Sequence, residues 1–372
     1  MKIIFAAGGT GGHINPALAA AGEIKKRHPN SEILFIGTEG KMETKLVPSA
    51  GFQIKTIEIN GFYRKPTIEN LKKNIKNVVL LFKSSGQTKQ IIKDFSPDVV
   101  VGFGGYVSGP VLRTAHKMGI KTAIHEQNAF PGVTNKALSK MVDRVMLTAR
   151  DAEKYMKCKN KPAVTGLPVR GEILLSDREF SRASLKIPAD AMLILSMGGS
   201  LGAKTINENI VKLISKRCND KKLFFIHATG QYGKWVPDKL KENGVDFTNK
   251  KNVVVREYID DMEVCLAAAD LIIGRAGASS LSEIEAMGKA SILIPSPNVS
   301  ENHQYYNALA LVKNNAAMMI EEKDLTEEKL ISMVDDFNKN REKLKQIGDN
   351  AKKMAILNSK EKICDIIEEL IN

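Results

Sequence analysis

The sequence predicts an α/β protein built from two doubly wound domains, each with a parallel sheet. Short apolar strands alternate with helical patterns in both halves of the chain, and each series opens with a strand that leads into a glycine-rich loop. The length of 372 residues also exceeds what one ordinary core covers. Ligands of such sheets bind beyond the carboxyl ends of the strands, so we expect the functional residues in the loops that follow strands.

The expected strands are mostly β-branched runs without charges. In the first half they lie at Ile3–Ala7, Ile33–Gly37, Phe52–Ile59, Asp98–Gly102, Thr122–His125 and Arg144–Thr148, with helical patterns such as Pro16–Arg27 and Gly109–Met118 between them. In the second half they lie at Met192–Met197, Leu223–His227, Val253–Val255, Leu271–Gly274 and Ser291–Ile294, and the tail from Arg341 to Asn372 is expected to form two helices. The alternation pauses near Gly166–Arg170. We therefore expect a domain boundary near residue 165.

The first glycine loop is Gly8–His13. Backbone without Cβ atoms can turn its N–H groups toward an anion, and Asn15 followed by Pro16 is typical of a helix N-cap and first helical residue. A strand, this loop and a helix N-terminus together favour a phosphate or diphosphate, beside which His13 could exchange a proton. A purely structural turn is the alternative. A dinucleotide fingerprint is excluded because Ile14 stands where its last glycine belongs.

Two further loops should lie at the same sheet edge. Gly104, Gly105 and Tyr106 repeat the pattern of the first loop, and the two glycine loops together could hold one diphosphate. His125 and Glu126 begin the stretch that comes directly after the next strand. An adjacent imidazole and carboxylate could be catalytic, although polar residues that cap neighbouring helices fit the sequence equally well.

The second half contains two more candidate phosphate sites. Gly198–Ala203 lies between a strand and a helix but is not a P-loop, because Ala203 replaces its second glycine. Ala276–Glu283 starts at a strand end and enters a helix whose first-turn N–H groups and small side chains favour phosphate. Glu283 could accept hydrogen bonds from two ribose hydroxyls, or interact only with the helix dipole. Glu301–Gln304 adds amide groups suited to sugar hydroxyls.

The segment 64–95 combines an apolar stripe with basic side chains. The stripe and the lysines on other faces are Ile68, Leu71, Ile75, Val78, Val79 and Phe82, and Lys72, Lys73, Lys76 and Lys83. A helix packed on the sheet with a solvated basic face fits this pattern, and so does a helix that binds an anionic membrane surface. Contact with lipid is our hypothesis.

Bulk composition limits the function classes. The formal net charge of +13 favours an anionic partner, which leaves nucleic acid, anionic lipid and phosphorylated substrates open. The four cysteines share no C-x-x-C spacing, so neither a zinc site nor a disulfide framework is expected. The N-terminus enters a strand directly, which predicts no secretory signal, and no apolar run approaches the ~20 residues that span a bilayer. Any membrane contact should therefore be peripheral.

Seven blocks in the same order resemble the MurG family of bacterial glycosyltransferases. They are Gly8–His13, Gly104–Pro110, His125–Asn128, Gly198–Ala203, Tyr258–Met262, Ala276–Glu283 and Gln304–Ala308. The resemblance implies a GT-B fold, two Rossmann-like domains facing a cleft, with the acceptor and membrane bound by residues 1–165, the donor bound by 166–356, and a C-terminal helix at about 357–372 packed back on the first domain.

The same resemblance implies a reaction in peptidoglycan synthesis. N-acetylglucosamine would pass with inversion from UDP-GlcNAc to the C4 hydroxyl of undecaprenyl-diphospho-MurNAc-pentapeptide, at the cytoplasmic face of the bacterial membrane. The implied UDP-GlcNAc residues are Thr10, Gly11, Gly12, Asn128, Arg170, Ser200, Ile259, Ala278, Ser279, Ser280, Leu281, Ser282, Glu283 and Gln304. Gly104, Gly105 and Tyr106 would face the acceptor diphosphate. Ile75, Val79 and Phe82, with Lys72, Lys73 and Lys76, would meet the membrane.

Inversion requires a base for the acceptor proton and stabilisation of the departing UDP. His13 is the first candidate for the base and Glu126 the second. No Asp-x-Asp motif is present, so backbone donors, helix dipoles and Arg170 are expected to stabilise the leaving group, with neither a metal nor another cofactor.

Two other functions stay open. A UDP-GlcNAc epimerase of the same fold class would use the donor site without a lipid acceptor. A nucleic-acid-binding protein would use the positive charge, but aromatic residues make up only 6% of the chain and no groove-reading motif is visible. We therefore expect no nucleic-acid partner.

Overall fold

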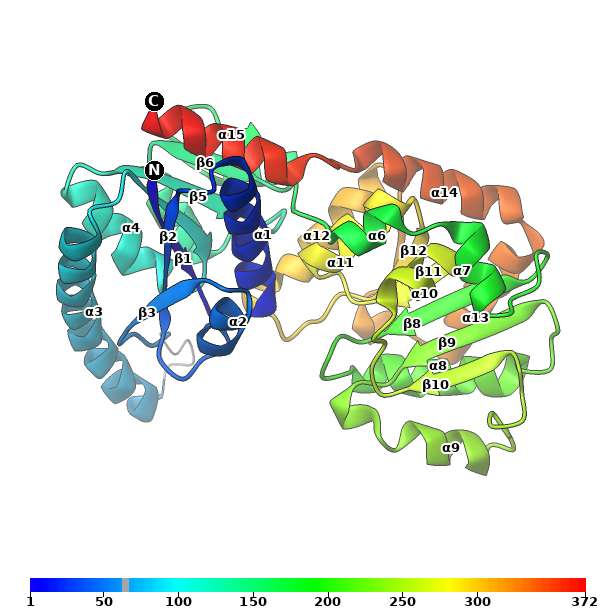
Figure 1. Cartoon of the computed structure of the whole chain (residues 1–372). Coiled ribbons are helices and arrows are strands. Elements are labelled where there is room, and N and C mark those ends of the chain that lie inside the picture. Colours follow the sequence, from blue (N-terminus) through cyan, green and yellow to red (C-terminus); the bar gives the residue numbers. More distant parts are fainter. Residues whose placement is uncertain (62–66) are drawn as a thin grey trace. The chain divides into compact units, whose positions relative to one another are not determined.

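The computed structural model describes residues 1–61 and 67–372, with only the backbone at Lys76. These residues form two compact units, Met1–Pro168 with Asn358–Asn372, and Val169–Leu357. In each unit, helices cover both faces of a central parallel sheet (Figure 1). Each sheet has a buried hydrophobic cluster on either face, which is why its strands are apolar along their whole length.

The sheet of the first unit has the doubly wound order. Its described strands are β1 (Lys2–Ala7), β2 (Glu32–Thr38), β3 (Gln53–Ile57), β4 (Val99–Gly104), β5 (Lys121–Glu126), β6 (Arg144–Leu147) and β7 (Ala163–Val164). Their spatial order is β3-β2-β1-β4-β5-β6-β7, and neighbouring strands are parallel. The strands expected from the sequence are confirmed, with ends shifted by at most two residues. The loops after β1 and β4 lie at the switch point of the sheet, where ligands of such folds bind.

Seven helical segments surround this sheet in the described residues. They are α1 (Gly11–Arg27), α2 (Glu43–Ser49), α3 (Ile68–Phe95), α4 (Ser108–Lys117), α5 (Val133–Leu138), the 3-10 helix η1 (Arg150–Tyr155) and α15 (Ser359–Ile371). Helix α15 comes from the C-terminal end of the chain and packs on α1. Ile363 and Ile367 are fully buried there, and Arg27 pairs with Asp365 at 2.6 Å. The last helix is therefore an integral part of the first unit.

Helix α1 begins earlier than the sequence indicated. The prediction that Asn15 caps this helix and Pro16 begins it is wrong, because Thr10 is the N-cap and Gly11 the first helical residue. The Ile14 N–H donates to Thr10 O at 3.2 Å, so the second half of the glycine loop already forms the first turn. Pro16 lies inside the helix, near its start, where its missing N–H removes one hydrogen bond.

Helix α3 carries the amphipathic segment. It begins after Thr67, whose hydroxyl accepts a hydrogen bond from the Asn70 N–H at 3.2 Å. The sequence suggested a start near Arg64, but residues 62–66 lie outside the described part of the chain.

The second unit repeats the same architecture. Its described strands are β8 (Met192–Met197), β9 (Leu223–Ala228), β10 (Val253–Arg256), β11 (Leu271–Gly274), β12 (Ala290–Leu293) and β13 (Met318–Met319). The order is β10-β9-β8-β11-β12-β13, again with parallel neighbours. The helical segments are α6 (Gly171–Leu175), α7 (Arg178–Ser184), α8 (Lys204–Arg217), η2 (Gln231–Gly233), α9 (Val236–Glu242), α10 (Met262–Ala268), α11 (Ala278–Met287), η3 (Ser300–Asn302), α12 (His303–Lys313), η4 (Glu322–Asp324), α13 (Glu327–Lys339) and α14 (Arg341–Met354).

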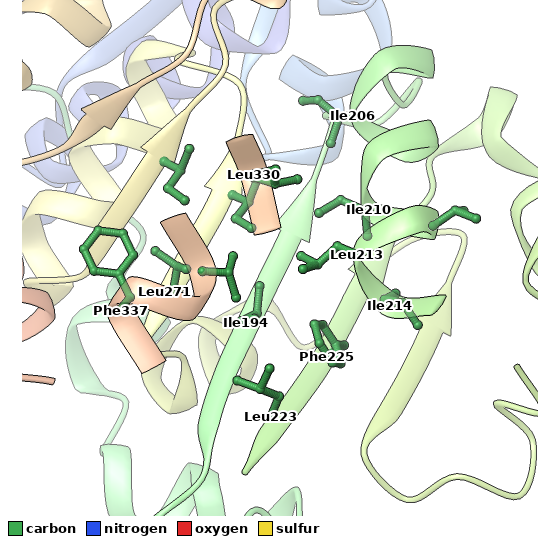
Figure 2. Close-up of a cluster of buried hydrophobic side chains, with 14 of the residues drawn as sticks. Ile194, Ile206, Ile210, Leu213, Ile214, Leu223, Phe225, Leu271, Leu330 and Phe337 are labelled. Atoms are coloured by element: carbon green, nitrogen blue, oxygen red, sulfur yellow. The ribbon is translucent and has the colours of Figure 1, made fainter. Parts of the chain in front are cut away.

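One hydrophobic cluster of this unit is shown in Figure 2. Ile206, Ile210 and Leu213 on α8 join Ile194 of β8 and Phe225 of β9, and all five are at most 2% exposed. The side chains at 206, 210 and 213 recur at helical spacing, so one face of α8 covers the sheet. Burying each such side chain contributes about 1.5–3 kcal/mol, which makes this sheet a rigid base for the loops at its edge.

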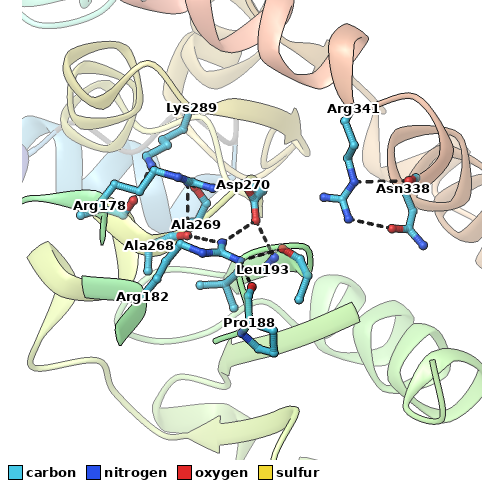
Figure 3. A network of polar contacts seen from close by, with 12 residues as sticks. Arg178, Arg182, Pro188, Leu193, Ala268, Ala269, Asp270, Lys289, Asn338 and Arg341 are labelled. Atoms are coloured by element: carbon cyan, nitrogen blue, oxygen red, sulfur yellow. Dashed lines mark hydrogen bonds and ion pairs between the residues drawn. The ribbon is translucent and has the colours of Figure 1, made fainter. Parts of the chain in front are cut away.

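A polar network fixes the opposite, amino-terminal edge of the same sheet (Figure 3). Asp270, just before β11, accepts hydrogen bonds from Arg178 and Arg182 on α7 and from the Leu193 N–H at 2.8 Å. Lys289 donates to the carbonyl oxygens of Ala267 and Ala269 at 2.5 and 2.9 Å, and burial lowers the pKa of Lys289 to about 7. Because this network lies at the amino end of the strands, we interpret it as structural.

Candidate functional site

The two glycine loops of the first unit touch each other. A Cβ atom on Gly105 would lie 2.4 Å from Gly8 O, and Gly104 and Gly105 have φ values of +101° and +81°, so both positions require glycine. The Ser108 hydroxyl accepts a hydrogen bond from the Gly104 N–H at 3.1 Å and lies 3.1 Å from Ala6 O. It thereby ties the loop after β4 to the end of β1, and the two loops form one continuous backbone surface.

His13 lies on this surface, with its ring against Gly104. A Cβ atom on Gly104 would be 2.7 Å from the ring atom Cδ2. The Nδ1 atom is 3.1 Å from Gly8 O. Nδ1 also lies 3.4 Å from the Thr10 hydroxyl, which can donate or accept. Because Gly8 O only accepts hydrogen bonds, the shorter contact favours a proton on Nδ1, and Nε2 then has the lone pair of the neutral ring. His13 thus has the tautomer that a base acting through Nε2 requires.

Glu126 is 2% exposed at the end of β5 and already has four hydrogen-bond donors. Its Oε1 accepts from the backbone and side-chain amides of Asn128 at 2.9 and 3.2 Å, and its Oε2 accepts from the Gly132 N–H at 3.1 Å and from Asn135 at 2.8 Å. This geometry holds the loop after β5 and orients Asn128. It suits a structural carboxylate better than one that takes up a substrate proton.

His125 is fully buried beside Glu126. Its Nε2 donates to Gly166 O at 2.9 Å, and burial lowers its pKa to about 4. The ring is therefore neutral at physiological pH and serves the packing of the loop. Tyr106, by contrast, is more than half exposed on the second glycine loop.

The glycine loop of the second unit has a similar construction. The Gly202 N–H donates to Gly199 O at 2.8 Å, and both glycines have positive φ. A Cβ atom on Gly202 would lie 2.2 Å from Thr229 O, so the loop packs tightly against the end of β9. Ser200, at the tip of this turn, is exposed.

Helix α11 begins beside this loop, at the end of β11. Gly277 is its N-cap, and Ala278, Ser279 and Ser280 form its first turn, which leaves backbone N–H groups without helical acceptors. Leu281, Ser282 and, before α10, Ile259 are all less than 9% exposed. The side chains of Leu281 and Ile259 belong to the core, so these two residues can meet a ligand only through their backbone.

Glu283 and Arg170 form an ion pair in the second unit. Arg170 Nε lies 3.1 Å from Glu283 Oε1. Burial raises the pKa of Glu283, and the guanidinium of Arg170 opposes that shift. Gln304, on α12, accepts a hydrogen bond from the Ser296 N–H at 2.9 Å, which fixes the orientation of its amide group.

The sequence reasoning missed a half-buried ion pair near these residues. Arg275 donates to Ile294 O at 3.1 Å and pairs with Glu322, which also accepts from the Thr205 hydroxyl at 3.1 Å. Beside it lies a cavity of about 480 Å³, lined by Thr205, Pro295, Pro297, Asn302, Tyr305, Glu321, Glu322 and Lys323. The one feature of the sequence that could have indicated Arg275 is its charge, because its neighbours in the stretch after β11 are small residues.

The predicted site residues therefore gather at two sheet edges. In the first unit, Thr10–His13, Gly104–Tyr106, Glu126 and Asn128 follow β1, β4 and β5. In the second unit the corresponding residues follow β8, β10, β11 and β12 or precede α6 as its N-cap; they are Arg170, Ser200, Ile259, Ala278–Glu283 and Gln304. Among residues 1–61 and 67–372, no group of three His, Cys, Asp or Glu side chains is placed to hold a metal ion. Within the same residues, every helix is too short or too polar to span a bilayer.

Comparison with known proteins shows which family the chain is similar to. Residues 3–147 match the glycosyltransferase family 28 N-terminal domain, and residues 193–369 match the glycosyltransferase family 28 C-terminal domain. The chain is 47% identical to an Acetivibrio thermocellus protein over all of this chain and 98% of the relative. That relative is named UDP-N-acetylglucosamine--N-acetylmuramyl-(pentapeptide) pyrophosphoryl-undecaprenol N-acetylglucosamine transferase.

Solved structures with a similar fold include a relative from the same family. Acinetobacter baumannii MurG superposes with a TM-score of 0.80 at 28% identity and covers 99% of both chains. UDP-GlcNAc 2-epimerase from Neisseria meningitidis, bound to UDP-GlcNAc, superposes with a TM-score of 0.67 at 13% identity, over 99% of this chain and all of that one. The second likeness concerns the fold alone. The two Rossmann-like units are thus those of a GT-B fold.

Proposed function

The chain belongs to glycosyltransferase family 28, and on this premise we propose that it transfers N-acetylglucosamine from UDP-GlcNAc to the C4 hydroxyl of undecaprenyl-diphospho-MurNAc-pentapeptide, with inversion. The observation that carries this proposal is the continuous surface of the two glycine loops, on which His13 has the tautomer of a base acting through Nε2. An acceptor that carries both a diphosphate and a nucleophilic hydroxyl matches these two features.

We assign the donor to residues 166–356. Ile259 would meet the uracil through its backbone, and Glu283 would accept hydrogen bonds from the ribose hydroxyls. Ser200, Arg170 and the first turn of α11 (Ala278–Ser280) would surround the diphosphate, where helix N–H groups and a guanidinium stabilise the charge that develops on departing UDP. Gln304 would contact the sugar. The resemblance also implies that Asn128, Thr10, Gly11 and Gly12 contact UDP-GlcNAc. The last three also belong to the loop that we assign to the acceptor diphosphate, and all four donor contacts stay predictions.

We assign the acceptor to residues 1–165. Its diphosphate would meet the backbone amides of Thr10–Gly12 and Gly104–Tyr106, and His13 Nε2 would take the proton of the attacking C4 hydroxyl. The oxygen then forms a bond to the anomeric carbon as the bond to UDP breaks. Glu126 is the second candidate for the base, but its four hydrogen-bond donors favour His13.

A transfer assay tests this function directly. Labelled GlcNAc from UDP-GlcNAc should appear in a short-chain analogue of the lipid acceptor, and turnover should persist in EDTA because backbone donors and Arg170 stabilise the leaving group. UDP release should depend on the acceptor. Release of UDP with formation of an epimerised sugar in the absence of acceptor would instead support the epimerase alternative, and loss of turnover in EDTA would contradict the metal-independent mechanism.

We further propose that α3 holds the protein at an anionic membrane surface. Large apolar side chains along this helix are exposed; they are Ile68, Leu71, Ile75, Val78, Val79 and Phe82. Exposed apolar residues in such number on one helix mark an interaction surface. Lys72 lies among them, and Lys73 pairs with Glu69 at 2.6 Å. The predicted contact of Lys76 concerns a side chain outside the described residues. A cytoplasmic-face location follows from this proposal and the nucleotide-sugar donor.

Changing Phe82 to serine should weaken retention by phosphatidylglycerol vesicles by about 10–100-fold at low salt, because one buried phenyl ring contributes about 1.5–3 kcal/mol. Replacing Lys72, Lys73 and Lys76 by glutamate should weaken it at least as much, at about 1 kcal/mol for each lost cation. Vesicle sedimentation measures both effects. Phe180→Ser is the matched control, because Phe180 on α7 is 74% exposed and Phe82 is 76% exposed. Equal retention of the Phe82 and Phe180 variants would rule out α3 as the contact.

A further inference from the structure

The catalytic loop of the first unit is supported by a buried carboxylate that the reaction scheme does not use. Glu43, the first residue of α2, has no exposed surface. Its Oε2 accepts a hydrogen bond from the Gly9 N–H at 3.1 Å, and its Oε1 accepts one from the Thr38 N–H at 2.9 Å. A fully buried carboxylate is retained only where hydrogen bonds compensate its lost hydration, so these two backbone donors account for its stability there.

Two glycines, Gly8 and Gly37, pack so closely against Glu43 that neither position has room for a side chain. A Cβ atom on Gly8 would lie 2.4 Å from Glu43 Oε1, and a Cβ atom on Gly37 would lie 2.6 Å from Glu43 Cγ. The side chain thus fits between the ends of β1 and β2 only because Gly8, directly after β1, and Gly37, the penultimate residue of β2, have no side chains. The Gly9 N–H, which the sequence suggested as a hydrogen-bond donor to phosphate, already donates to Glu43. A phosphate would therefore be bound by the N–H groups further along the loop.

The same peptide unit also contacts His13. The group that joins Gly8 to Gly9 donates through its N–H to Glu43, and its carbonyl oxygen, Gly8 O, lies 3.1 Å from His13 Nδ1. A peptide unit is planar, so fixing its N–H also fixes the direction of its carbonyl. One carboxylate on α2 and one imidazole on α1 are therefore joined by a single rigid group.

We propose that Glu43 is a positioning residue for the reaction, a role that rests on the function proposed above. It fixes the Gly8–Gly9 peptide so that Gly8 O holds the proton on His13 Nδ1 and keeps Nε2 as the basic atom. Glutamine cannot replace it, because both of its partners are N–H donors and a glutamine amide offers only one acceptor atom. In Glu43→Gln, either the Gly9 N–H or the Thr38 N–H faces an NH₂ group, so the side chain can no longer hold both backbone donors.

The test compares Glu43→Gln with Asp143→Asn. Asp143 is the matched control because its carboxylate also accepts a backbone N–H, that of Thr122 at 2.9 Å, but at the amino-terminal edge of the same sheet. Both substitutions should lower thermal stability. Only Glu43→Gln should lower kcat, by about 10–100-fold, since a displaced base loses much of its effect, while the KM for UDP-GlcNAc changes less than about two-fold.

A second readout does not depend on turnover. Selective ¹⁵N labelling of histidine reports the tautomer by NMR. The wild-type ring of His13 should carry its proton on Nδ1, and Glu43→Gln should shift the population toward Nε2–H. Should the wild type prove to lack transferase activity while this shift is seen, the positioning role stands and the proposed function fails. An unchanged tautomer and kcat in Glu43→Gln would overturn the positioning role.

Gly8→Ala provides an independent route if Glu43→Gln folds poorly. The added methyl group should displace the carboxylate of Glu43 without changing its charge. It should reproduce the loss of kcat and the tautomer shift. If both substitutions act through the same peptide, the double variant should lose little more than either single variant. Losses in kcat that multiply would contradict this coupling.

Discussion

Replacing His13 by alanine is expected to lower kcat by about 10²–10⁴-fold at saturating concentrations of both substrates. The imidazole is the group that we propose takes the C4 proton, and its Nδ1 contact with Gly8 O leaves Nε2 as the acceptor of that proton. The loss should therefore appear in kcat, because the variant has no group at this position that can take the proton.

A transfer assay with both substrates varied separates this effect from weaker binding. The KM for UDP-GlcNAc should change little, since we assign the donor mainly to residues of the second unit. His116→Ala is the matched control, because His116 is exposed in the last turn of α4 and far along that helix from the glycine loop. Near-normal kcat in His13→Ala would exclude His13 as the base and return the role to Glu126.

The sequence located the loops but not the contacts that shape them. Glycine runs directly after apolar strands predicted both glycine loops of the first unit, because a backbone with positive φ values has few alternatives to glycine. The start of α1 was predicted wrongly, since Pro16 is such a strong helix-start signal that it outweighed the helical turn of Gly11–His13. Local signals of this kind cannot show that glycines continue into a helix.

Residues brought in from distant parts of the chain were beyond sequence reasoning. Glu43 is 34 positions from Gly9, on a short helix with no strong pattern of its own, and its meaning depends on the neighbouring β1 and β2. Ser108 was part of a recognised block, but its hydroxyl acts on Gly104 and Ala6, which only the pairing of β1 with β4 brings together. Sheet order, rather than any motif, determines these contacts.

In the second unit, too, the sequence predicted the loops but not the contacts between distant residues. Strand ends and the small residues at the start of α11 predicted a phosphate site, and Glu283 was predicted as a ribose acceptor; both stay predictions. The ion pair between Glu283 and Arg170 was not predicted, because their interaction depends on how α6 packs near α11. Burial raises the pKa of the half-buried Glu283 carboxyl group, and the guanidinium of Arg170 opposes that rise.

Glu283→Gln is accordingly expected to lower kcat/KM for UDP-GlcNAc by about 10²–10³-fold. A charged carboxylate that accepts two hydroxyl hydrogen bonds contributes about 1.5–3 kcal/mol for each, and an amide accepts with one atom and no charge. Wild-type kcat/KM should also fall toward low pH at a pH above the ordinary carboxyl range, because protonation of Glu283 removes the acceptor. Glu283→Gln should lack that dependence.

The ribose contact itself can be tested with 2′-deoxy-UDP-GlcNAc. The wild type should discriminate against this donor by at least about 10-fold in kcat/KM, whereas Glu283→Gln should accept both donors almost equally, since the lost hydroxyl no longer has a charged partner. Glu285→Gln is the matched control on the same helix. Two residues further along, Glu285 points to a different side of α11, and burial raises its pKa to about 7, so that glutamine resembles its neutral form. Equal discrimination by the wild type and Glu283→Gln would show that the ribose binds elsewhere.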